Sequence, residues 1–324
     1  MIIFLLSTAL FFDFLNGFHD SSNIVATVIS SRALKPRTAL YMTATAHFAA
    51  PFIFGVAVAT TVGEDLINPS AINTTVVIAG VIAAILWNLF TWFIGIPSSS
   101  SHALVGGLLG ASILTNGLEI VKLGGLLKIL TALFISPPIG LLVGYLIMHL
   151  VLYIFKNATP RINNLFKRMQ ILTSLSLALS HGTNDSQKTM GVITMGLVAA
   201  GYQETFHVPI WVIAASAGAI ALGTAFGGWR LIHTLGGRIY KIRPVHAFTS
   251  QAASTAVILS AALLGGPVST TQVVGSAIMG AGAAERVSKV RWQVGQNMVV
   301  TWVVTIPVNA LVAALIYSLL IKVV

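Results

Sequence analysis

Long stretches of apolar residues, separated by short polar clusters, run along this chain from end to end. Four of them each supply roughly the 20 residues that a membrane-spanning helix needs; they are Thr75–Ile96, Lys128–Phe155, Val208–Gly228 and Asn297–Ile321. A further apolar run follows the first residue. The pattern predicts an all-α polytopic membrane protein with about 10–12 transmembrane or re-entrant helices, some of them broken near the bilayer midplane.

Charged residues are scarce, which supports the membrane assignment. Of 324 residues, 56% are hydrophobic and 8% are charged, and the mean hydropathy is +0.90. A soluble domain carries about 25% charged residues. The sequence has no cysteine, which excludes a disulfide framework, a thiolate nucleophile and a cysteine zinc site. The N-terminal apolar run lacks a basic leader and a small-residue cleavage site, so it is interpreted as a structural helix rather than a signal peptide.

The positions of lysine and arginine predict the orientation of the chain. Basic residues concentrate in cytoplasmic loops, so four clusters are placed inside: Arg32, Lys35 and Arg37; Lys156, Arg161, Lys167 and Arg168; Arg230, Arg238, Lys241 and Arg243; and Arg286, Lys289 and Arg291. The acidic segments Gly63–Asn73 and Ala199–Pro209 are placed outside. Both termini then lie outside a plasma or inner membrane. The formal charge of +10 reflects orientation and contact with the lipid bilayer, with no nucleic-acid partner.

Two polar motifs occur twice. "GFHDSS" (Gly17–Ser22) resembles "GTNDSQ" (Gly182–Gln187), and "GIPSSSSHALVGG" (Gly95–Gly107) resembles "GGPVSTTQVVGS" (Gly265–Ser276). The copies are 165 and 170 residues apart, so two motifs recur at nearly one offset. This predicts a first repeat over residues 1–155, a cytoplasmic linker over 156–168 and a second repeat over 169–324.

The loops that flank the two copies carry opposite charge. The first Asp motif is followed by the basic segment 32–37, whereas the second is followed by the acidic segment 199–209. Corresponding loops therefore lie on opposite sides, and the two halves are predicted to be inverted in the membrane. Inverted repeats are typical of secondary transporters, whose sites lie near the midplane.

The polar motifs also predict helix ends inside the protein. Gly17 and Gly182 permit breaks, after which Asp20, Ser21, Asp185 and Ser186 can cap the next helix. Pro97 and Pro267 stop a helix, and the hydroxyls of residues 98–101 and 269–271 can cap the one that follows. Four helix N-termini in the interior favour an anion held by backbone N–H and hydroxyl donors.

The two aspartates need a partner, because a buried carboxylate is costly and repels an anion. A coupling cation neutralises them and makes the anion site favourable. Sodium suits the oxygen ligands, and a proton on the same aspartates remains the alternative. Asn23 corresponds by position to Lys188, so Lys188 is hypothesised to hold a permanent ammonium where the first half binds a cation.

The segments "NGFHDSSNIVATVISSRALKP", "SHGTNDSQKTMGVI" and "GGPVSTTQVVGS" resemble the inorganic phosphate transporter (PiT) family, especially its bacterial branch. The resemblance covers essentially the whole chain. It implies a symporter that moves inorganic phosphate with sodium or protons, is built from inverted repeats and forms a homodimer. Residues that match the family motifs are Asp20, Asn23, Asn184 and Asp185, with the hydroxyls of residues 98–100 and 269–271. His19 departs from the family, in which asparagine is common at this position.

These observations assign two sets of candidate site residues. The predicted phosphate-binding residues are Ser21, Ser98, Ser99, Ser100, Thr183, Ser186, Lys188, Ser269, Thr270 and Thr271. The predicted sodium ligands are Asp20, Asn23, Asn184 and Asp185. No cofactor is expected besides the transported sodium or proton. His19, Asp13 and Gln251 are left without an assigned role.

The other function classes fit the sequence less well. Ser180, His181 and Asp185 contain the residue types of a catalytic triad, but adjacency in sequence is not triad geometry. The chain has no zincin motif, nucleophile elbow or phosphate-binding loop, so it is not predicted to be an enzyme. A passive oxyanion channel is a further alternative, although such a channel has no use for buried carboxylates. The residues therefore favour cation-coupled import of a small oxyanion by alternating access, with sodium preferred over a proton, and the family resemblance implies that this anion is phosphate.

Overall fold

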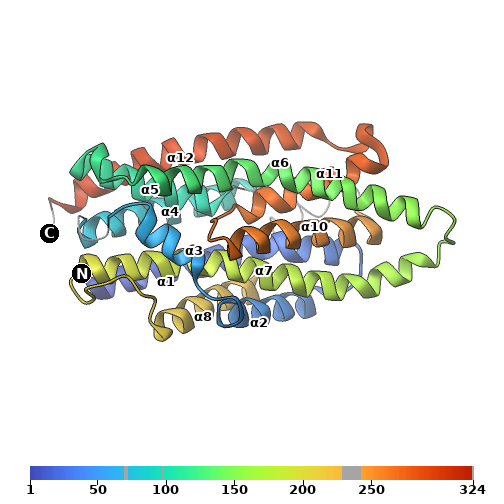
Figure 1. Ribbon diagram of the computed structural model, residues 1–324, viewed down its shortest axis with the longest axis horizontal. Helices are drawn as coiled ribbons and strands as arrows, with labels where there is room; N and C mark the ends of the chain where they lie inside the picture. Colours follow the sequence, from blue (N-terminus) through green and yellow to red (C-terminus); the bar gives the residue numbers. More distant parts are fainter. Residues whose placement is uncertain (69–71, 97, 228–241, 323–324) are drawn as a thin grey trace.

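The computed structural model describes residues 1–324 except 69–71, 97, 228–241 and 323–324, and it leaves the side chains of residues 289 and 294 undescribed. The described residues are almost entirely helical and form eleven α-helices (Figure 1). Four of these are long and apolar enough to cross a bilayer: α1 (Ile2–Ser30), α4 (Thr74–Ile94), α6 (Leu123–Ile154) and α12 (Trp292–Leu320). The predicted all-α, multi-pass membrane fold is confirmed.

The remaining helices are shorter or bent. They are α2 (Pro36–Phe54), α3 (Ala57–Thr60), α5 (Ser100–Asn116), α7 (Ile162–Ala199), α8 (Ile210–Phe226), α10 (Pro244–Leu263) and α11 (Thr270–Arg286). The chain bends by 79° between α2 and the segment Ala57–Asp65, which ends in a π-helical turn. α8 has 17 residues, short of the length that the apolar run Val208–Gly228 predicts.

Two helices form the polar centre of the bundle. α1 packs against α4, α7 and α8, and α7 packs against α1, α2 and α10. Both bury their polar motifs, whereas α6 and α12 expose leucines such as Leu146 and Leu315 on their outer faces. Polar residues inside and apolar residues on the outer surface suit a protein embedded in a bilayer, because lipid solvates apolar side chains.

Two helical hairpins enter the bundle from opposite ends. α4 and α5 form one hairpin, and α10 and α11 form the other (Figure 1). At the open end of the second hairpin, Glu285 of α11 pairs with Arg243 and with His246 Nε2, the latter at 2.8 Å. The hairpin tips meet in the interior, where Ser101 Oγ donates to the carbonyl oxygen of Val268 at 3.1 Å. The tips therefore bring the N-termini of α5 and α11 together.

Each hairpin also packs against a long helix from the other half of the chain. α5 packs against α12 and α11 packs against α6. Both contacts depend on glycine: a Cβ at Gly110 of α5 would lie 2.1 Å from the Ala310 carbonyl oxygen, and one at Gly280 of α11 would lie 2.0 Å from that of Leu141. Any side chain at either position would collide with backbone, so the close approach requires a residue without Cβ.

The predicted helix breaks at Gly17 and Gly182 are wrong. α1 and α7 run without interruption through both Asp motifs, so neither Asp20 nor Asp185 caps a helix. The glycines allow close packing instead, because a Cβ at Gly17 would lie 2.1 Å from the Ile220 carbonyl oxygen, and one at Gly182 would lie 2.8 Å from His47 Cα. Of the four expected interior N-termini, those of α5 and α11 are formed.

This packing makes Gly17→Ala a destabilising substitution. The added methyl group meets the backbone of α8, and overpacking of this kind costs about 1–3 kcal/mol. We expect a lower midpoint of thermal unfolding (Tm) for the purified protein in detergent. Gly218→Ala is the matched control on α8, because a Cβ there meets no described heavy atom within 4 Å. An unchanged Tm for Gly17→Ala would show that the α1–α8 contact is looser than described.

Some sequence predictions fall outside the described residues. Pro97, the proposed helix stop before α5, is one of them. The basic residues Arg230, Arg238 and Lys241 are the others, together with the end of the apolar run at Gly228. Pro267, the second proposed stop, lies between α10 and α11 as expected.

Candidate functional site

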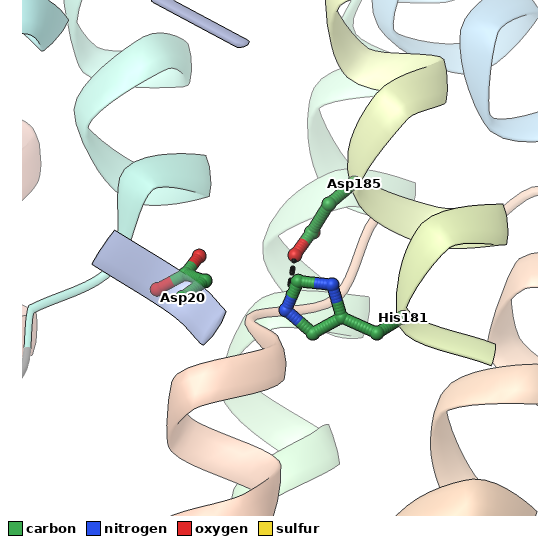
Figure 2. Close-up of side chains that lie close together, drawn as sticks. All are labelled: Asp20, His181 and Asp185. Carbon is green, nitrogen blue, oxygen red and sulfur yellow. Dashed lines mark ion pairs between the residues drawn. The ribbon is translucent and has the colours of Figure 1, made fainter. Parts of the chain in front are cut away.

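Two carboxylates from the two central helices meet in the interior with a histidine. Asp20 of α1 and His181 and Asp185 of α7 place one ligand atom each within 4.8 Å of one another, and all three residues are buried. Figure 2 shows Asp20 approaching from one side of the site and the two α7 residues from the other. Residues 165 positions apart in the chain are thus brought together as the sequence predicts.

Asp20 is held by residues from three segments. His19 Nδ1 lies 2.9 Å from Asp20 Oδ1, and Thr271 Oγ1 donates to the same oxygen at 3.0 Å. Ser100 Oγ donates to Oδ2 at 3.3 Å. Asn23 Nδ2 in turn donates to Thr271 Oγ1 at 2.9 Å. The hydroxyls at the starts of both hairpin return helices therefore contact the first aspartate.

Asp185 has a stronger set of partners. His181 Nε2 lies 2.9 Å from Asp185 Oδ2, and Thr270 Oγ1 donates to that oxygen at 2.9 Å. Lys188 forms an ion pair with Oδ1. The Lys188 ammonium also donates to Ser101 Oγ at 2.6 Å and to the Val268 carbonyl oxygen at 3.0 Å. The second aspartate is thus paired with a buried lysine inside the protein.

The predicted hydroxyl residues divide into two groups. Ser100, Thr270 and Thr271 contact the charged cluster, as described above, and so does Ser101, which the sequence predicts only as a possible helix cap. Ser99 caps α5 by accepting from the backbone N–H of His102 at 3.2 Å, and Ser98 bonds Thr91. Ser269 Oγ is buried without a hydrogen-bond partner among the described residues.

The hydroxyls of the Asp motifs bond to their own helices. Ser21 donates to the Phe18 carbonyl oxygen at 2.9 Å, Thr183 to that of Leu179 at 2.8 Å and Ser186 to that of Gly182 at 2.6 Å. All three are buried close to the aspartates along the chain, and neither Thr183 nor Ser186 forms a described hydrogen bond with either carboxylate. Their predicted role in phosphate binding stays a prediction.

The two asparagines of the predicted sodium set each keep a free oxygen. Asn23 and Asn184 are buried, and their Oδ1 atoms have no hydrogen-bond partner among the described residues. Asn184 Nδ2 donates to the Gly266 carbonyl oxygen at 3.2 Å, which ties α7 to the tip of the second hairpin. A buried amide oxygen without a donor is available to a cation, since leaving it unsatisfied is costly.

His47 is a site residue that the sequence did not reveal. Its ring stacks on His181 with centroids 4.8 Å apart, and its Nδ1 lies 2.8 Å from Thr224 Oγ1. It lies on α2, outside every repeated motif, so no spacing or repeat pointed to it. His47 therefore packs against the imidazole that contacts Asp185.

The residues without a predicted role are also placed. Asp13 is buried on α1 on the side that faces α7. Gln251 of α10 links the two central helices, because its Nε2 donates to Thr27 Oγ1 at 2.8 Å and its Oε1 accepts from Thr173 Oγ1 at 2.6 Å. His19 contacts Asp20 directly. His19 therefore belongs to the site, whereas Gln251 joins the helices that carry it.

Comparisons with known proteins agree with this architecture. The phosphate transporter family model matches residues 16–160 and 155–313. A protein of Rhizobium meliloti (strain 1021) named "Probable low-affinity inorganic phosphate transporter" is 44% identical over 98% of this chain and 96% of its own length. A protein of the same name from Bacillus subtilis (strain 168) is 42% identical over 99% and 97%. These relatives are named as transporters rather than enzymes.

A solved structure supports the fold independently. The structure described as "The sodium-dependent phosphate transporter" superposes with a TM-score of 0.90 over 100% of this chain and 99% of its own, at 23% sequence identity. At that identity the likeness concerns the arrangement of the helices. The family model matches both halves, and the relatives above cover nearly the whole chain, so the assignment does not depend on the short motifs alone. This chain belongs to the phosphate transporter family.

Proposed function

We propose that the protein is a secondary active transporter that imports inorganic phosphate, driven by a sodium gradient, through alternating access. The meeting of Asp20 and Asp185 between the two hairpin tips is the observation that carries this proposal. Phosphate as the substrate rests on family membership and on the printed names of the relatives.

The charges of the cluster explain why a cation is needed. Two unit charges of one sign within 4.8 Å repel by roughly 3 kcal/mol at an effective dielectric of about 20. Lys188 offsets only one of the two carboxylates. The site therefore keeps negative charge, which opposes an anion until a cation binds. Asp20, Asn23, Asn184 and Asp185 offer oxygen atoms of the kind that sodium prefers.

Donors for phosphate lie next to these oxygens. The N-termini of α5 and α11 point backbone N–H groups towards the centre, and such termini favour anions. Ser98, Ser99, Ser100, Ser269, Thr270 and Thr271 surround them, and Ser21, Thr183 and Ser186 complete the proposed set of phosphate donors. Lys188, whose donors bind Asp185, Ser101 and the Val268 carbonyl, contributes its positive charge to the phosphate site. A bound sodium beside these donors makes phosphate binding depend on the cation, which is the coupling that a symporter requires.

Alternating access is supported by the exchange of contacts between the two halves. α5 with α12 corresponds to α11 with α6, and α1 with α8 corresponds to α7 with α2. Residues 1–155 and 169–324 are therefore proposed as inverted repeats joined by the linker 156–168. The start of α1 and the end of α12 lie at one end of the bundle and the α6–α7 connection at the other (Figure 1). Labelling of single cysteines from either side, in a chain without native cysteine, tests this orientation.

Sodium coupling is tested by uptake into proteoliposomes at fixed pH and zero membrane potential. A tenfold sodium gradient should drive about tenfold phosphate accumulation for each coupled ion. With choline in place of sodium, phosphate uptake should fall to that of protein-free liposomes. Accumulation driven by a pH gradient without sodium would instead establish proton coupling. A passive channel would accumulate phosphate under neither gradient.

A further inference from the structure

We propose that Lys188 is a built-in cation that takes the place of a coupling ion in the second half of the protein. The exchangeable cation then binds beside Asp20, and the lysine neutralises the charge of Asp185. This inference rests on the proposed function and assigns unequal roles to the two aspartates.

Two contacts in each half have a counterpart in the other, whereas the contacts of His19 and Thr271 with Asp20 and of His181 with Asp185 do not. Ser100 donates to Asp20 and Thr270 donates to Asp185, and these two hydroxyls are 170 positions apart, the offset of the hydroxyl motifs. Asn23 donates to the Thr271 hydroxyl, and Lys188 donates to the Ser101 hydroxyl. Asn23 and Lys188 are 165 positions apart, and Ser101 and Thr271 are 170 positions apart, which are the offsets of the two motifs. Lys188 therefore occupies the position that Asn23 has in the first half.

The Lys188 ammonium fills its position completely. An ammonium has three N–H donors, and three oxygen acceptors surround this one: a carboxylate oxygen of Asp185, Ser101 Oγ at 2.6 Å and the Val268 carbonyl oxygen at 3.0 Å. The side chain is 2% exposed. A carboxylate, a hydroxyl and a carbonyl are the oxygen ligands that would otherwise suit a sodium ion. The lysine thus supplies a fixed positive charge in a shell of hard oxygen atoms.

In the described part of the first half, no lysine or arginine is paired with Asp20, whose partners are His19, Ser100 and Thr271. Asn23 Oδ1 is buried and has no hydrogen-bond partner in the described part of the chain, and Asp20 Oδ2 has a long contact of 3.3 Å with Ser100. These oxygens are available to an added cation. Asp13, which is also buried on α1, faces Thr189, Asp185 and Lys188 but is matched by Ala178 at the same offset. It lies outside the matched pair, and its contribution is common to the wild type and the variants compared below.

The charge balance predicts how many ions the matched pair needs. Two carboxylates and one ammonium leave one net negative charge, and one exchangeable sodium ion neutralises it. If Lys188 becomes asparagine, the second half acquires the residue type of the first and loses its fixed charge. A second sodium ion is then required before phosphate can bind.

Lys188→Asn is tested in proteoliposomes with a tenfold sodium gradient, choline as the balancing cation and zero membrane potential. We expect one more sodium ion per phosphate, and therefore about a further tenfold rise in limiting accumulation. The initial rate should become steeper in sodium concentration. Lys188→Arg, which keeps the charge, should retain the wild-type ion count. Lys128→Asn is the matched control, because this lysine is half-exposed and pairs with Asp65 rather than with Asp20 or Asp185.

A binding measurement complements the uptake assay. For purified Lys188→Asn in detergent, the rise of Tm with sodium concentration at constant ionic strength should be about twice as steep as in the wild type, because each bound ion adds to stability. Asn23→Lys is the reciprocal variant: a second built-in ammonium should remove the dependence on sodium in both assays, and it decides the question if Lys188→Asn does not fold.

The outcomes separate the two proposals. A wild-type protein that accumulates phosphate with sodium, together with Lys188→Asn and Asn23→Lys variants that keep the wild-type ion count, would overturn the role of Lys188 alone. A wild-type protein that accumulates no phosphate under a sodium gradient contradicts the proposed function itself.

Discussion

Asp20→Asn is expected to abolish sodium-driven phosphate accumulation while the protein stays folded. Asparagine keeps the size of the side chain: its Oδ1 can still accept from Thr271, and its Nδ2 can donate to the Ser100 hydroxyl, so the packing of α1 is preserved. The carboxylate charge that attracts the cation is lost. A hydrogen bond or contact to a charged group is worth about 1.5–3 kcal/mol, so sodium affinity should fall by at least roughly 10- to 100-fold. Uptake at graded sodium concentrations measures the loss.

The matched control is Asp65→Asn. Asp65 is also acidic, but its side chain is 43% exposed and lies 3.8 Å from Lys128. Exposed ion pairs of this kind contribute about 0–1 kcal/mol, so sodium dependence should not change. The Tm of Asp20→Asn should stay close to that of the wild type in the absence of sodium. Wild-type sodium dependence in Asp20→Asn would remove the basis for cation binding at this aspartate.

The general architecture could be predicted because hydropathy and repeats report on it directly. The apolar runs Thr75–Ile96 and Lys128–Phe155 correspond to α4 and α6, with ends shifted by five residues or fewer. The nearly equal offsets between the copies of the two motifs were sufficient to predict that Asp20 and Asp185 share one site. Both signals depend on solvent preference or on sequence similarity within the chain, and neither requires knowledge of tertiary contacts.

The path of the backbone through the Asp motifs could not be predicted in the same way. Glycine next to polar residues is compatible with a broken helix and equally with close helix packing. Only the neighbours decide between the two, and here the backbone of α8 against Gly17 and that of α2 against Gly182 favour packing. The same limit explains why His47 was missed, since its contact with His181 joins helices without any shared motif.

The Asp185–Lys188 pair was visible only in part. Spacing of three residues on a helix places two side chains on one face, which permits an ion pair. The contacts of Lys188 with Ser101 and with the Val268 carbonyl depend on the meeting of the two hairpin tips. These tertiary contacts determine that the lysine charge is used inside the protein.

Asp185→Asn is expected to act first on stability, in contrast to Asp20→Asn. The substitution leaves the Lys188 ammonium, which is 2% exposed, without its carboxylate. Breaking a buried ion pair by removal of one partner costs about 3–5 kcal/mol, because an uncompensated charge stays buried. Lys188→Met should lower the free energy of unfolding by a similar amount, because it leaves the buried Asp185 carboxylate without its ammonium partner. The Tm in detergent without sodium measures both.

The double variant Asp185→Asn/Lys188→Met separates an ion pair from two independent contacts. Removing both buried charges relieves the penalty, so the double variant should be more stable than either single variant, with a coupling energy of about 1–3 kcal/mol or more. The half-exposed pair of Asp65 and Lys128 provides a control double-mutant cycle. The effects of Asp65→Asn and Lys128→Met on stability should be small and additive. If the losses of the two buried variants simply add, Lys188 does not neutralise Asp185, and the second aspartate would need an external cation as the first does.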